Sequence, residues 1–184
     1  MGSGVHDEFV LRKEVRHSFW LRWVPEEIAG AYALSVVSLA ELTSEGVLGD
    51  HLYGHLLMGF MALPFSIAEA ATGLAMESLT PQVLTSGTAE WASLLWPGLL
   101  QALLLWWLLR RGRHSARSER WGRLLATLTT FLVIVSGMVV IFDQWAPRRP
   151  GGIPLLVLGV LQAFFVFVYA YNRSFALPLS KTES

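Results

Sequence analysis

The sequence predicts an all-α fold, a multi-pass transmembrane helical bundle with four spans and a fifth membrane helix that either crosses or dips. Composition is the first observation: hydrophobic residues make up 53% and charged residues 15% of 184, and the mean hydropathy is +0.47. Such values fit a water-facing surface poorly. The charges are also clustered, so long stretches bring no ionised group into lipid. Tryptophans stand near the ends of these stretches, where amphipathic rings favour the membrane interface.

Three windows of 19 residues contain no charged residue: 91–109, 124–142 and 153–171. As a helix, each reaches about 28 Å, close to the hydrocarbon thickness of about 30 Å. A backbone in lipid must satisfy its own hydrogen bonds, so helix is expected throughout. We predict a transmembrane helix in each window.

A fourth span is predicted over 52–76, with a kink at Pro64. The segment 28–48 begins apolar but carries Glu41 and Glu45 near its far end, so it either crosses, tilts, or dips and returns. Ahead of it, 1–27 is expected to form a cytoplasmic segment with an interfacial helix, since aromatic and basic residues mix there. The alternative is an ordinary solvated helix. Residues 172–184 form a C-terminal tail, and 1–184 make a single membrane domain.

The connection 110–123 is rich in arginine and contains a single acid, Glu119. By the positive-inside rule this loop is cytoplasmic. Overall, 14 basic residues balance 14 acidic ones, so net charge predicts no nucleic-acid binding. The loop is expected to contact anionic lipid headgroups or a partner, or to serve only as a solvated topology signal. Its arginines are Arg110, Arg111, Arg113, Arg117, Arg120 and Arg123.

The other basic residues bear on how many helices cross. If 28–48 does not cross, twelve basic residues share the side of the arginine loop, and only Arg148 and Arg149 lie opposite. If it does cross as a fifth span, the division is eight against six. Charge bias therefore favours an even number of crossings, whereas hydropathy favours a fifth helix.

Three polar residues within the apolar segments are candidates for an ion or proton pathway: Glu69, Gln101 and Gln162. A carboxylate at helix depth is costly in lipid and usually faces protein or water. The alternative for Glu69 is a position near the headgroups, where its side chain reaches the interface. The alternative for each glutamine is a hydrogen bond across a helix interface.

A second polar cluster lies around the turn after 28–48. It contains carboxylates and imidazoles that suit zinc or another divalent ion, but polar residues are also expected where a chain turns at a membrane surface. No cofactor is predicted, and without cysteine the chain has no thiolate ligand, cysteine nucleophile or disulfide. The candidate metal ligands are Glu41, Glu45, Asp50, His51 and His55.

The stretch 28–111 resembles a family of small, uncharacterised integral membrane proteins of actinobacteria. The resemblance is carried by an apolar helix, the short turn at Gly49 and Asp50, an apolar run broken by Pro64, and a helix that ends in arginines. It implies that 28–48 is a true membrane helix. It implies no activity, ligand or catalytic residue.

We therefore expect a non-enzymatic protein of a bacterial plasma membrane, an accessory or interaction subunit whose partners are the bilayer and another membrane subunit. No catalytic motif argues for an enzyme. One alternative is a small proton- or cation-coupled transporter that uses Glu69. The other is a metal-dependent membrane enzyme that uses the cluster containing His51 and His55.

Overall fold

The computed structural model describes residues 4–49, 51–63, 65–67, 87–112 and 114–175, and side chains only within 23–49, 52–63, 65–67, 95–112 and 114–171. Over these ranges every regular element is helical, which confirms the predicted all-α fold. Four long helices dominate: α1 (Gly4–Ser44), α4 (Gly87–Arg111), α5 (Ala116–Ile141) and α6 (Arg149–Phe175). The short helices are α2 (His51–Met61) and the 3-10 turn η1 (Ala146–Arg148).

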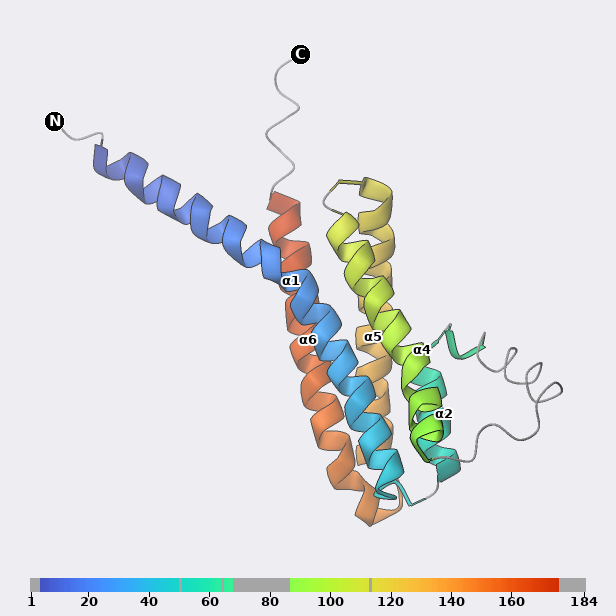
Figure 1. The fold of residues 1–184 in the computed structure, drawn as a ribbon. Coiled ribbons are helices and arrows are strands. Elements are labelled where there is room, and N and C mark those ends of the chain that lie inside the picture. The colour runs from blue at the N-terminus through green and yellow to red at the C-terminus, as the bar shows by residue number, and fades with distance from the viewer. Residues whose placement is uncertain (1–3, 50, 64, 68–86, 113, 176–184) are drawn as a thin grey trace.

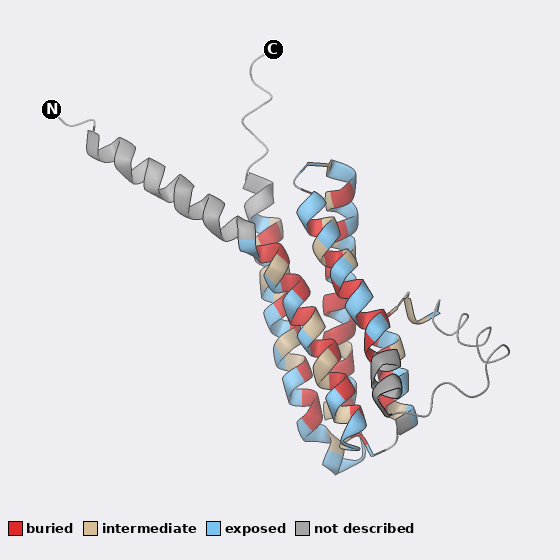
Figure 2. Cartoon of the chain, in the orientation of Figure 1, coloured by how far each residue is buried: buried red, intermediate tan, exposed pale blue. Residues whose placement is uncertain are grey.

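The four long helices form an antiparallel bundle (Figure 1). Each of them packs against two neighbours, in the order α1, α4, α5, α6 and back to α1. The α4–α5 connection lies at one end of the bundle, and the α5–α6 connection lies at the other. We call these the α4–α5 end and the α5–α6 end. Buried residues follow the facing sides of the helices (Figure 2).

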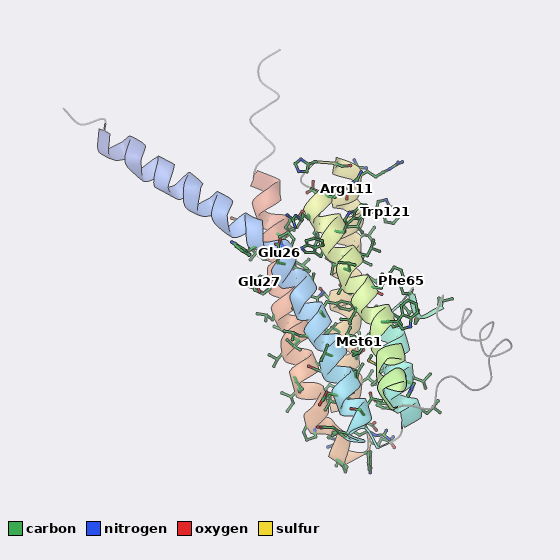
Figure 3. All side chains as sticks on the ribbon, viewed as in Figure 1. Glu26, Glu27, Met61, Phe65, Arg111 and Trp121 are labelled. Atoms are coloured by element: carbon green, nitrogen blue, oxygen red, sulfur yellow. The ribbon has the colours of Figure 1, made fainter. Side chains whose placement is uncertain are left out.

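The helix α1 joins two segments that the sequence suggested separately, 1–27 and 28–48. Pro25 lies inside it, and the helix changes direction where Figure 3 labels Glu26 and Glu27. A proline inside a helix removes one backbone hydrogen bond and crowds the preceding turn, which bends the helix. After this bend, α1 runs along both α4 and α6 to the α5–α6 end.

The helix α2 is shorter than the predicted span 52–76, because it ends at Met61, three residues before Pro64. It runs back along the second half of α1. A Cβ on Gly54 would collide with the Thr43 side chain, and the Tyr32 hydroxyl donates a 2.8 Å hydrogen bond to the Met61 carbonyl. Eleven residues of helix are about 16 Å long, roughly half the hydrocarbon thickness. The proposed kink at Pro64 lies outside the described residues.

The helices α5 and α6 approach each other closely. A Cβ on Gly137 would lie 2.8 Å from the Leu156 nitrogen, and one on Gly152 would lie 2.6 Å from the Gly137 carbonyl oxygen. Only residues without a side chain allow backbones to approach this closely, as membrane helices commonly do. Ser136 and Gly137 of this interface are both buried.

Two helical stretches are long and apolar enough to cross a membrane, Ala116–Ile141 and Ala146–Tyr171. They contain the predicted spans 124–142 and 153–171 but for Phe142, which directly follows α5. Within their apolar windows only 44% and 22% of residues are buried, so large apolar side chains face outward. The predicted span 91–109 lies within α4, whose described side chains begin at Leu95.

Candidate functional site

Two glutamines lie in the interior of the bundle, and their environments differ. Gln162 of α6 is fully buried, and its Nε2 donates a 2.9 Å hydrogen bond to Thr129 Oγ1 of α5. Gln101 of α4 is equally buried, but neither atom of its amide has a partner among the described residues. The hydrogen bond across a helix interface that the sequence offered as an alternative is therefore present for Gln162. For Gln101 no such bond is present.

Helix register places Gln101 level with the Gln162–Thr129 pair. On one side, Gly98 packs against Val36, so Gln101, one turn further along α4, is level with Tyr32, one turn earlier on α1. On the other side, Gly122 packs against Leu108 and Leu109. Two turns from that contact, in the direction of the α5–α6 end, α4 carries Gln101 and α5 carries Thr129. These two residues therefore lie at the same level of the bundle.

These four side chains, Tyr32, Gln101, Thr129 and Gln162, form what we call the polar layer. It lies halfway along the bundle, at the depth where α2 ends on the Tyr32 hydroxyl. The rest of the core is mainly apolar, and its other buried polar residues are small hydroxyl residues: Ser35, Thr43, Ser118, Thr130 and Ser136. Such a layer is able to bind a small polar group by hydrogen bonds, since a buried amide without a partner is costly. Glu69, the acid predicted to act with these glutamines, lies outside the described residues.

The predicted metal ligands are only partly described. Glu41 and Glu45 are exposed at and just after the end of α1, and His55 is exposed on α2. Asp50 and the His51 side chain lie outside the described residues. In the part of the chain whose side chains are described, no three acidic, histidine or cysteine residues gather in a metal-binding arrangement. The metal site therefore stays a prediction.

The arginine loop lies at the α4–α5 end (Figure 3). Arg110 stacks over Trp106 and Arg111 over Trp107, with guanidinium carbons 5.1 and 5.0 Å from the ring centroids. Cations in the last turn of α4 also complement its helix dipole. In the first turns of α5, Arg117 and Arg120 are exposed, while Arg113 lies outside the described residues.

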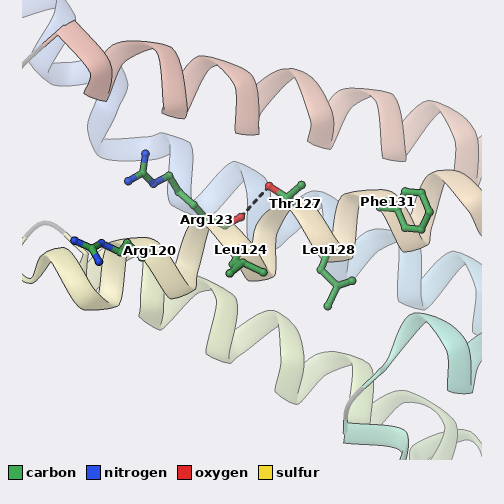
Figure 4. Close-up of a pocket in the computed structure, with 6 residues that line it drawn as sticks. All are labelled: Arg120, Arg123, Leu124, Thr127, Leu128 and Phe131. Carbon is green, nitrogen blue, oxygen red and sulfur yellow. Dashed lines mark hydrogen bonds between the residues drawn. The ribbon is translucent and has the colours of Figure 1, made fainter.

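A shallow, open groove of about 650 Å³ continues from this end along the outer side of α5 (Figure 4). The part of the groove at the α4–α5 end is basic, and the part nearer the middle of the bundle is apolar. Residues spaced by three or four positions share one side of a helix, so six residues of α5 form one continuous stripe. The groove is lined by Arg120, Arg123, Leu124, Thr127, Leu128 and Phe131.

The α5–α6 end has a different arrangement, which we call the aromatic clasp: Tyr53, Asp143, Trp145 and Arg148. The Arg148 guanidinium lies 4.5 Å from the Tyr53 ring centroid and 4.6 Å from that of Trp145. It donates a 2.9 Å hydrogen bond to Asp143 Oδ2. The backbone N–H of Trp145 donates a 3.1 Å hydrogen bond to Asp143 Oδ1. This bond and the Arg148 guanidinium hold the pKa of the Asp143 carboxyl below its ordinary value.

Sequence reasoning missed the clasp and half of the polar layer. Arg148 counted only as a charge opposite the arginine loop. Thr129 did carry a signal, since it lies seven residues from both Gly122 and Ser136, on one buried side of α5. Tyr32 carried none, because its partner Met61 is 29 positions away.

Compared with protein-family models, curated proteins and solved structures, the chain matches none. The resemblance of 28–111 to the actinobacterial membrane family stays a prediction.

Proposed function

We propose that the chain is a multi-pass integral protein of a bacterial plasma membrane and acts there as an accessory subunit without catalysis. One observation carries the proposal: large apolar side chains are exposed on the outer side of α6 and, beyond Arg123, on the outer side of α5. In α6, Ile153, Val157, Val160, Phe164 and Phe167 are all exposed, each by more than half. Water around such a surface would be unfavourable by about 25 cal/mol for each Å².

The topology we propose has four crossings, by α1, α4, α5 and α6. The α2 segment enters beside α1 and does not cross, because α2 reaches only the polar layer and both α2 and α4 begin at the α5–α6 end. This arrangement resolves the conflict in the sequence. Twelve basic residues then lie on the side of the arginine loop and two on the other, although α1 crosses.

An accessory role is supported by where the charges lie. Among the described side chains of α1, α4, α5 and α6, the polar groups buried at mid-bundle are neutral amides and hydroxyls. The described charges gather towards the two ends. The interior thus offers hydrogen bonding and packing, while the arginines at the proposed cytoplasmic end offer contact with anionic headgroups or another membrane subunit.

The chain has no cysteine, so every introduced cysteine is its only thiol. We expect Glu45→Cys, Thr88→Cys and Gln144→Cys to react with a membrane-impermeant maleimide in intact cells. Ser115→Cys, in the arginine loop, is expected to react only after permeabilisation. Labelling of Glu45→Cys and Thr88→Cys on opposite sides would contradict the non-crossing α2 segment. Release of the protein by carbonate without detergent would contradict the membrane proposal itself.

A second candidate function is a small proton- or cation-coupled transporter. The unpartnered amide of Gln101 supports it, because a buried polar group without a partner is able to contact a passing ion or water. In liposomes, Glu69→Gln and Gln101→Leu are then expected to lower proton-linked flux. Thr127→Ala, on the outer side of α5, serves as the control. Equal flux in all proteins, or none in any, would count against the transporter.

A further inference from the structure

The groove on α5 joins a basic surface to an apolar surface along one side of the helix. At its start, Arg120 and Arg123 come from neighbouring turns next to the exposed ring of Trp121. Glu119 lies 3.6 Å from Arg123 and offsets part of its charge. Arg120 forms no ion pair with any described residue. One net positive charge therefore stands at the mouth of the groove, at the depth that tryptophan favours.

The deeper part of the groove offers only apolar surface. Leu124, Leu128 and Phe131 are 60%, 40% and 59% exposed. The one polar residue among them, Thr127, uses its hydroxyl to donate a 2.9 Å hydrogen bond to the Arg123 carbonyl of its own helix. From Arg120 to Phe131 the stripe is about 16 Å long, comparable to one leaflet of hydrocarbon.

We propose that this groove is a binding site for one anionic phospholipid. Its phosphodiester lies between Arg120 and Arg123, and an acyl chain lies along Leu124, Leu128 and Phe131. Guanidinium groups bind phosphate oxygens by paired, charge-assisted hydrogen bonds. The order of the residues matches a lipid, since charge comes first and hydrocarbon follows towards the membrane centre. The site rests on the proposed membrane function and adds a specific ligand to it.

A soluble anion would use only the arginines and leave the apolar stripe uncovered. A partner helix would cover the apolar stripe but would not require a phosphate-binding pair of arginines at one end. The joined basic and apolar parts favour a lipid with both a charged head and a chain. Phosphate-containing headgroups without acyl chains are therefore expected to bind much more weakly than the intact lipid.

The test uses the full chain purified in neutral detergent, with lipid occupancy measured by native mass spectrometry and by the shift in melting temperature. Phosphatidylglycerol is expected to bind and stabilise, whereas phosphatidylcholine and free glycerol phosphate are not. Arg120→Gln combined with Arg123→Gln is expected to weaken phosphatidylglycerol binding about 30-fold, since each arginine near a charged surface contributes about fivefold. The matched control, Arg110→Gln with Arg111→Gln, removes equal charge from the same end but no residue that lines the groove, and is expected to weaken binding much less.

A second pair of variants tests the chain-binding part. Phe131→Ala is expected to lower occupancy, while Phe164→Ala, an equally exposed phenylalanine on α6, is expected to leave it unchanged. Equal losses in both arginine pairs would overturn the site, as would equal binding of phosphatidylcholine or glycerol phosphate. A disulfide-linked dimer of Leu128→Cys would assign the groove to a second copy instead. The membrane proposal is tested separately, by whether carbonate releases the protein without detergent. A failed lipid site would leave that result unchanged, so the two failures can be distinguished.

Discussion

The two ends of the bundle use arginine in opposite ways. At the α4–α5 end, five described arginines lie at the surface, and one of them, Arg123, forms an ion pair with Glu119 on the neighbouring turn of α5. At the α5–α6 end, Arg148 is enclosed by two aromatic rings and bonded to Asp143. Arginine thus provides surface charge at one end, and at the other end it ties α2 to the connection between α5 and α6. Charge counting along the sequence does not separate these roles.

The largest effect is expected where the turn after α1 meets the clasp. Gly49 has φ of +75° and lies so close to Trp145 that a Cβ would collide with the ring. We expect Gly49→Ala to lower the free energy of unfolding by about 3 kcal/mol, from backbone strain and overpacking together. The measurement is unfolding in mixed micelles titrated with dodecyl sulfate.

Gly46 provides the matched control for this substitution. It also has positive φ, +68°, but an added Cβ would meet nothing within 4 Å. Gly46→Ala is therefore expected to cost only the backbone term, about 1 kcal/mol. Equal losses for the two variants would show that the approach to Trp145 contributes nothing.

Removing the arginine of the clasp is expected to cost less. Arg148→Gln loses two cation–π contacts, each worth about 0.5–1 kcal/mol, together with the bond to Asp143. We expect a loss of about 2 kcal/mol in the same titration. Arg117→Gln, at the exposed end, should change stability by under about 0.5 kcal/mol. A comparable loss for both would erase the contrast between the two ends.

Between the ends, the polar layer provides a third test. Replacing Gln101 by leucine removes a buried amide that has no described partner, so we expect a gain of about 1 kcal/mol. Gln162→Leu breaks the bond to Thr129 and is expected to lose about 0.6 kcal/mol. A Gln101→Leu protein less stable than the wild type would mean that this amide is bonded in the membrane.

The smallest effect expected is the pH dependence of the clasp. The pKa of Asp143 is lowered in the folded protein, so its contribution is present above the ordinary carboxyl value of 3.8. It is lost as the pH falls through the lower, folded-state pKa. Melting temperature should therefore decline below pH 3.8 in the wild type. Asp143→Asn should lack this component, and an unchanged profile in that variant would assign the decline to other groups.

Hydropathy predicted the helices α4, α5 and α6 well, because charge-free windows of membrane length leave the backbone little choice. Of the predicted span 52–76, the structure describes only 52–63 and 65–67, and the helix α2 there ends at Met61. Apolar composition does not encode that α2 stops at Met61 and docks on α1, since that depends on the contacts of Tyr32 with Met61 and of Gly54 with Thr43. Both contacts join residues distant along the chain.

The candidate site was predicted in part. Gln101 and Gln162 look alike in sequence, each a single amide in an apolar window. What separates them is the register of α5 against α6, which the glycines of their interface determine and which brings Thr129 to Gln162. The groove and the clasp depend on side-chain directions and turn geometry, which neither composition nor charge spacing contains.

The glycine contacts between α5 and α6 have a mechanical consequence. At Gly137, Gly152 and Gly159, atoms of the opposite helix occupy the space where a side chain would lie. Sliding one helix past the other would drive Leu156 or Ile134 against the backbone of the opposite helix. We therefore expect α5 and α6 to move together as one rigid unit.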